Sequence, residues 1–160
     1  SVNNASVNVS GGNAVFLDGG EAGKMGGGDG GELSVNAYKA ATNKGVLTAN
    51  AGSVGGENGG TGGSMFVNSE AAKASNTGDV AANGADGAEV GGDGGFVSVN
   101  GLSANNSGNI SLNAGNATNP GAIFVTGPTG GDGGELTVLG QGLDAASNTG
   151  TVTYTFGSGI

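Results

Sequence analysis

The sequence predicts an all-β fold, a parallel β-helix (β-solenoid) of about four glycine- and asparagine-rich units that is three-sided and right-handed. Glycine clusters begin at residues 27, 59, 91 and 130, so the intervals are 32, 32 and 39 residues. Each cluster leads into a short run of alternating apolar and polar residues, and each unit has an Asn-x-Gly tripeptide before a second such run. Alternation between turn residues indicates strands, and strands repeated in constant order favour stacked coils.

The strands of each unit follow in a fixed order. The first follows the glycine cluster, as in ELSVNA, SMFVNS, FVSVNG and ELTVLG, and the second follows Asn-x-Gly, from Val46, Asp79, Asn109 and Thr151. A weaker third run ends at Val54 and at Val90, and in the long third unit spans residues 122–126. The segments NAYKAAT and SEAAKAS, which precede the Asn-x-Gly tripeptides, are too short for helices and are interpreted as connectors.

One face of each strand is expected to be buried. The inward positions are Leu33/Val35, Leu47/Ala49, Met65/Val67, Val80/Ala82, Val97/Val99, Ile110/Leu112, Leu136/Val138 and Val152/Tyr154. The alternate positions are mostly Ser, Thr or Asn. The chain is therefore expected to form a single domain over residues 1–160, with a partial unit at 6–26 and full units at 27–58, 59–90, 91–129 and 130–160.

The glycine clusters are expected to be tight corners, because a coil must turn sharply and glycine accepts positive φ at little cost. Asparagines follow the inward aliphatic pairs, and stacking would place their amides in register as a hydrogen-bonded ladder. The predicted ladder is Asn36, Asn50, Asn68, Asn83, Asn100 and Asn113. A bundle of polyproline-II-like glycine helices is a weaker alternative, because glycine at every third position lasts only a few residues, near 20–26 and 56–62.

Composition excludes several function classes. The 160 residues include no Cys, His or Trp, only four lysines as cations, and have a net charge of −9. Catalysis by Ser/His, Cys/His or a His-ligated metal is therefore excluded, and nucleic-acid binding lacks the required basic patch. No stretch has the roughly 20 apolar residues that cross a bilayer. We expect no enzymatic activity, no nucleic-acid partner and no membrane insertion.

Two sets of side chains are candidate binding sites. Asp29, Asp93 and Asp132 recur in the glycine clusters, where stacking could bring carboxylates close enough to bind Ca²⁺, although a structural or solubility role is favoured. The calcium pattern GGxGxDxUx is not satisfied, since Phe96 stands where it requires Asp. Phe66 and Phe124 are outward aromatic positions that could stack on a sugar or contact a protein, or be covered by a connector. No other cofactor is expected.

The repeat resembles that of secreted bacterial right-handed β-helix proteins, in particular the filamentous-haemagglutinin-like adhesins and related surface proteins. The resemblance lies in the GGxGG cluster, the alternating strands ELSVNA and FVSVN, and the Asn-x-Gly turn, over about residues 6–156. It implies an exported, elongated, non-enzymatic protein, secreted or on the cell surface.

The ends of the predicted stack lack a recognisable cap. A solenoid exposes unpaired backbone groups at both ends, and neither SVNVS from Ser6 nor the final TVTYTF resembles a covering element. We expect other copies, in a homo-oligomer or filament, or further parts of a longer chain, to satisfy the ends. The expected function is that of a self-assembling subunit of a surface fibre or a rigid adhesin segment. The alternative is a binding module for carbohydrate, ice or Ca²⁺.

Overall fold

The computed structural model describes residues 2–3, 7–8, 28–52, 58–117, 129–142 and 146–159, which form three parallel sheets and no helix. Sheet I contains β3 (Glu32–Ala37), β6 (Ser64–Ser69), β9 (Phe96–Gly101) and β12 (Glu135–Gly140). Sheet II contains β1 (Val2–Asn3), β4 (Ala41–Asn43), β7 (Lys73–Asn76), β10 (Ser103–Asn106) and β13 (Ser147–Asn148). Sheet III contains β2 (Val7–Asn8), β5 (Leu47–Thr48), β8 (Val80–Ala81), β11 (Ile110–Ser111) and β14 (Val152–Thr153).

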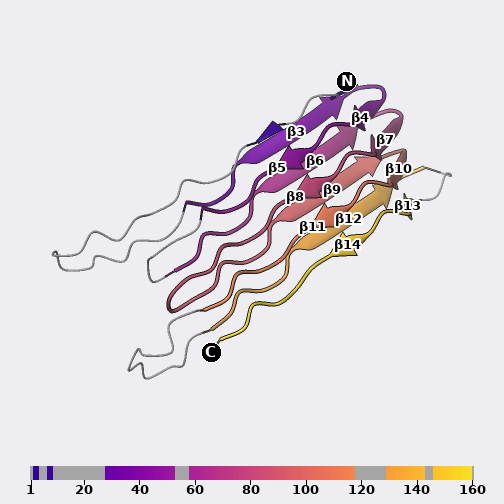
Figure 1. Ribbon diagram of the computed structural model, residues 1–160. Helices are drawn as coiled ribbons and strands as arrows, with labels where there is room; N and C mark the ends of the chain where they lie inside the picture. The colour runs from indigo at the N-terminus through magenta and orange to yellow at the C-terminus, as the bar shows by residue number, and fades with distance from the viewer. Residues whose placement is uncertain are drawn as a thin grey trace.

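The chain passes through sheets I, II and III in this order four times, and each pass lies on the preceding one (Figure 1). We call these passes coil one (28–52), coil two (58–90), coil three (91–117) and coil four (129–142 and 146–159). Every strand pairs in parallel with its equivalent in the next coil, so that Val67 lies between Val35 and Val99. The predicted all-β, three-sided parallel solenoid is confirmed, and its three sheets do not close on one another.

The position of one side differs from the prediction. Sheet II is formed by β4, β7, β10 and β13, which lie in the segments interpreted as connectors. Among the residues expected to form the third side, Val90 makes only single bridges to Asn58 and Thr129, while Val54 and residues 122–126 lie outside the described residues. The sheet II strands have two to four residues, and β4, β7 and β10 each contain one buried alanine, such as Ala74. A run of two to four residues is too short to show alternation in the sequence. These segments are recognised as strands only because they pair between coils.

The expectation that the glycine clusters form tight corners is wrong. Residues 91–95 run straight into β9, and their amides donate in two directions. The N–H groups of Gly91 and Gly94 donate along the stack to coil four, at 2.9 and 2.8 Å. Those of Gly92 and Gly95 donate across the interior to carbonyls of the returning segment 82–85, at 2.8 and 2.7 Å. The direction repeats every three residues, which is the period of a polyproline-II-like glycine helix.

Glycine is required here by close approach rather than by φ. A Cβ on Gly95 would lie 2.1 Å from the carbonyl oxygen of Gly63 and 2.8 Å from the Cβ of Ala82. Neither Gly63 nor Gly95 has a backbone in the left-handed region. The glycine clusters thus let the backbones of neighbouring coils, and the opposite wall of the same coil, approach so closely that no side chain would fit.

The core is a thin column of aliphatic side chains at the expected inward positions. One cluster lies between sheets I and III, and a smaller one lies between sheets I and II. The first contains Leu47, Met65, Val97, Ile110 and Leu112, all at most 2% exposed. At about 1.5–3 kcal/mol per buried aliphatic side chain, this column supplies a large share of the fold's stabilisation.

Candidate functional site

A buried row of asparagines runs along the stack at sheet II. Asn43, Asn76 and Asn106 are fully buried, and each Nδ2 donates to the Oδ1 of the next asparagine at 2.7 Å, ending at Asn148. Each of the three also donates to the backbone carbonyl two residues later, at 2.9–3.0 Å. Sequence reasoning missed this row because it assigned the Asn-x-Gly tripeptides to turns alone. Their recurrence before the second strand of every unit was the available signal.

The six asparagines predicted as a ladder lie in two separate rows. Asn36, Asn68 and Asn100 occupy one register row on the outer face of sheet I, where Asn68 Nδ2 donates to Asn36 Oδ1 at 3.1 Å.

The other three follow sheet III. There Asn50 Oδ1 accepts from the backbone N–H and the Nδ2 of Asn83, at 2.9 and 3.0 Å. Asn83 Oδ1 in turn accepts from the N–H of Asn113 at 2.8 Å. Both rows are at least partly exposed, so they stabilise the surface of the stack rather than its interior.

The recurrent aspartates act as hydrogen-bond acceptors between coils. Asp29 Oδ1 accepts from the N–H of Thr61 at 2.8 Å, and Asp93 Oδ1 accepts from the N–H of Asp132 at 2.8 Å. A whole coil, with Thr61 at the equivalent position, separates Asp29 from Asp93. Within the described ranges, no three His, Cys, Asp or Glu side chains gather in a metal-binding group. These contacts assign Asp29 and Asp93 a role in stacking, and calcium binding stays a prediction.

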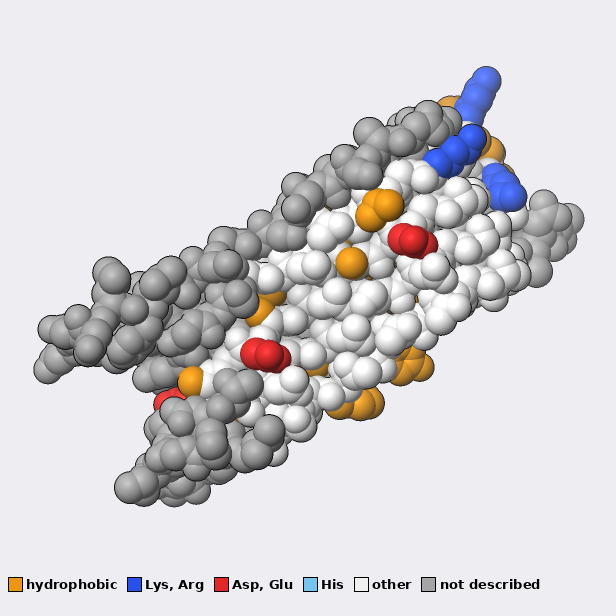
Figure 2. All heavy atoms as spheres, in the orientation of Figure 1, with side chains coloured by type: hydrophobic (Ala, Val, Ile, Leu, Met, Phe, Trp, Pro, Cys, Tyr) orange, Lys and Arg blue, Asp and Glu red, His pale blue; other side chains and the backbone are white. Residues whose placement is uncertain are grey.

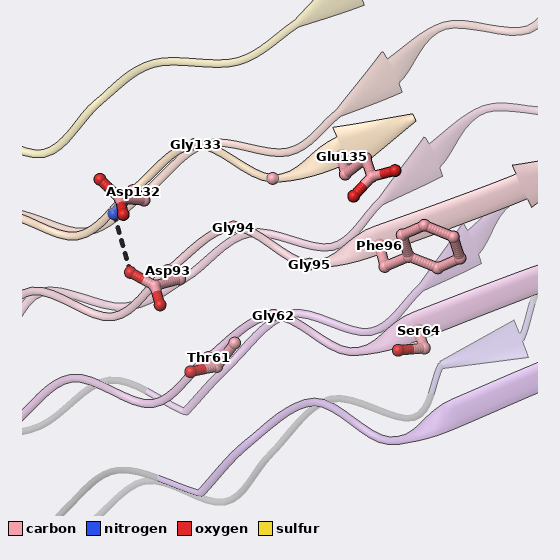
Figure 3. A pocket seen from close by; sticks show the side chains of 11 residues that line it. Thr61, Gly62, Ser64, Asp93, Gly94, Gly95, Phe96, Asp132, Gly133 and Glu135 are labelled. Carbon is pink, nitrogen blue, oxygen red and sulfur yellow. Dashed lines mark hydrogen bonds between the residues drawn. The ribbon is translucent and has the colours of Figure 1, made fainter. Parts of the chain in front are cut away.

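A groove of about 320 Å³ crosses coils two to four where the glycine clusters enter sheet I (Figure 3). Glycine backbone forms its floor. One wall carries Thr61, Asp93 and Asp132, and the other carries Ser64, Phe96 and Glu135. The floor amides of Gly62 and Gly94 already donate to the next coil. The groove therefore offers a ligand mainly side-chain oxygens and one aromatic ring.

Two aromatic rings lie together on the outer face of sheet I. The ring centroids of Phe66 and Phe96 are 5.7 Å apart, and the ring planes are inclined by 50°. Both side chains are half-buried. Phe66 was predicted as a contact residue and Phe96 was not, because their diagonal pairing depends on the register between coils. Phe124, the second predicted contact residue, lies outside the described residues.

Coil four forms an open end of the stack. Its inward side chains are more exposed than their equivalents in coil three: Tyr154 is 59% exposed, whereas Leu112 in the same row is 0% exposed. Nearby Phe156 is 72% exposed. The strands β12, β13 and β14 are the last of their sheets. This end thus presents apolar side chains beside three strand edges.

The opposite end is different. Sheets II and III continue past coil one through β1 and β2. In coil one the inward side chains Ala41, Leu47 and Ala49 are fully buried, and Leu33 on the edge strand β3 is partly buried.

No family model, curated protein or solved structure matches this chain. In the part of the chain that the structure describes, no helix has the length and hydropathy needed to span a membrane.

Proposed function

We propose that the protein is a non-enzymatic structural element, secreted or on the cell surface, that assembles by stacking at its open end. The observation that carries this proposal is the exposure of core positions in coil four beside three strand edges. Covering that end would bury Tyr154 and Phe156 and pair the free backbone groups of β12, β13 and β14. The extracellular location is proposed from the resemblance of the repeat to secreted β-helix proteins.

The interior of the stack supports a mechanical role. Each inner coil is hydrogen-bonded to the coils on both sides through the ladders of three sheets. The glycine clusters add bonds across the interior, such as that from Gly95 N–H to Ala82 O. The asparagine row adds side-chain bonds along the same axis. Bonds in both directions make a stiff rod, which suits a fibre subunit or a rigid spacer.

The proposal is tested by sedimentation velocity and electron microscopy over a range of protein concentrations. The wild-type chain is expected to form elongated assemblies as its concentration rises. The variant Tyr154→Lys should sediment as a monomer, because a lysine at the open end would be buried without a partner on stacking. The matched control is Leu102→Lys, since Leu102 is 44% exposed but lies in the interior coil three, in the bend after β9.

Leu102→Lys should assemble like the wild type, and both variants should keep the β-type circular dichroism spectrum. A wild-type chain that remains monomeric at high concentration, or equal loss of assembly in both variants, would contradict the proposal.

Carbohydrate binding in the groove is a second candidate function. The aromatic pair of Phe66 and Phe96 beside the side-chain oxygens favours it, because a sugar offers C–H faces that stack on a ring and hydroxyls that donate to oxygens. Titration calorimetry with neutral oligosaccharides tests it. Phe96→Ala should abolish the heat of binding, and Phe156→Ala, which removes an exposed ring outside the groove, should not. Absence of any heat from a broad panel would exclude this candidate.

A further inference from the structure

The strands at the two ends of the stack occupy the same register rows. In sheet II one row contains an asparagine at every level, and the neighbouring row is polar in every described coil. The first row is Asn3, Asn43, Asn76, Asn106 and Asn148. The second is Thr42, Ser75, Asn105 and Ser147 in the four coils, preceded by the apolar Val2 on β1. In sheet III one row is aliphatic throughout, namely Val7, Leu47, Val80, Ile110 and Val152. The edge strand β1 therefore matches the edge β13 at its asparagine position, and the edge strand β2 matches the edge β14 at its aliphatic position.

The asparagine row has a direction. Asn43, Asn76 and Asn106 each donate from Nδ2 toward the C-terminal end, and Asn76, Asn106 and Asn148 each accept at Oδ1 from the preceding coil. Asn148 accepts from Asn106 and is itself exposed at the last coil. The row thus ends on an amide whose donor side faces onward, and it would be extended by a strand with asparagine at the same position. β1 has Asn3 at that position.

We propose that a second copy of this chain docks head-to-tail on coil four, with its β1 beside β13 and its β2 beside β14 in the register used between coils. This inference rests on the proposed stacking function and adds the partner and its polarity. Head-to-tail docking keeps all strands parallel and continues the three rows described above. Docking of two coil four ends on each other would instead place Asn148 opposite its own copy and interrupt the rows. Head-to-tail contacts are heterologous and do not close, so they generate a filament.

The charge distribution favours the same polarity. Lys39, Lys44 and Lys73 lie in coils one and two, and these lysine side chains gather at the N-terminal end of the stack beside sheet II (Figure 2). At the two ends, coil one carries Lys39 and Lys44 together with Asp29 and Glu32, whereas the described residues of coil four carry Asp132 and Glu135 and no lysine. Head-to-tail docking therefore brings the acidic coil four toward a coil whose described charges balance, whereas tail-to-tail docking joins two acidic coils.

Engineered cysteines test this polarity without background, because the chain contains none. Neighbours in one row of a parallel sheet are about 4.8 Å apart, within the Cα separation that a disulfide spans. Val2→Cys and Ser147→Cys are purified separately, mixed at a concentration at which the wild type assembles, and oxidised. The expected product on a non-reducing gel is a disulfide-linked dimer of the two variants. The control mixes Val2→Cys with Asn105→Cys. Asn105 lies in the same row as Ser147 but in the interior coil three, so this mixture should give no dimer.

A second pair probes sheet III independently. Asn8→Cys and Thr153→Cys share another row and should also give a mixed dimer. A mixed dimer from either pair supports the inference. Self-linked Ser147→Cys without the mixed product would show tail-to-tail docking, which overturns the polarity and leaves the stacking function in place. Assembly of the wild type with no product from either pair overturns the inference, and a wild type that never assembles overturns the stacking function as well.

Discussion

The buried asparagine row predicts an unequal cost for the same substitution at two of its positions. In Asn76 the side chain makes three hydrogen bonds: it accepts from Asn43, and it donates to Asn106 Oδ1 and to Gly78 O. A hydrogen bond of this kind contributes about 0.5–1.5 kcal/mol net, and a buried group that loses its partner costs about 1–3 kcal/mol. Since Asn76 is fully buried, Asn76→Ala should lower the free energy of unfolding by about 3–5 kcal/mol.

Asn148→Ala is the matched control at the open end. Its side chain is exposed and accepts one bond from Asn106, which keeps its second bond to Gly108 O. The expected loss is about 1 kcal/mol. Asn76→Asp should cost at least as much as Asn76→Ala, because a carboxylate oxygen would replace the amide nitrogen that donates to two oxygen acceptors.

Urea unfolding followed by circular dichroism measures these differences, at a protein concentration low enough to keep the chain monomeric. With a slope of about 2 kcal/mol/M, Asn76→Ala should lower the midpoint by about 2 M and Asn148→Ala by about 0.5 M. Equal shifts for the two variants, or a shift for Asn76→Ala no larger than a typical surface substitution, would refute the idea that the row is a cooperative buried element.

Three further predictions concern packing, the open end and the aspartates. Gly94→Ala should lower the free energy of unfolding by about 3 kcal/mol or more, because the new Cβ would lie 2.2 Å from a backbone oxygen. At the equivalent position of coil four, a Cβ on Gly133 has no contact below 3.6 Å, so Gly133→Ala should change the free energy of unfolding by less than about 0.5 kcal/mol. Thermal unfolding of the two variants measures the difference. Leu112→Ala should lower the free energy of unfolding by about 2–5 kcal/mol, because Leu112 is fully buried. Tyr154→Ala in the same row should lower it by less than about 1 kcal/mol, because Tyr154 is exposed. Similar losses in the two variants would mean that coil four is covered in the monomer. Asp93→Ala should cost about 1 kcal/mol and Asp93→Asn almost nothing, since an amide oxygen still accepts the backbone bond. Equal losses in the two variants, together with a stabilisation by added Ca²⁺ that only the wild type shows, would instead indicate a metal ligand.

The candidate sites were predictable to the extent that each depends on residues within one unit. The recurrence of Asp29, Asp93 and Asp132 and the outward position of Phe66 follow from the repeat and from alternation. The contact between Phe66 and Phe96 does not, because the two residues belong to different coils and meet only through the register of sheet I. For the same reason the six predicted asparagines lie in two rows rather than one. Alternation shows that each asparagine follows a strand, but it does not show which sheet that strand joins.

The sequence by itself determined the all-β class, the unit of about 32 residues and the inward aliphatic positions, because strand alternation and repetition are local properties that recur along the chain. Only the tertiary structure decided that the Asn43 row is the buried one, that the glycine clusters are straight walls and that coil four is the open end. Each of these depends on how closely segments of different coils approach. For example, a Cβ at Gly95 would clash with Gly63 one coil away, and the sequence of neither segment alone shows that contact.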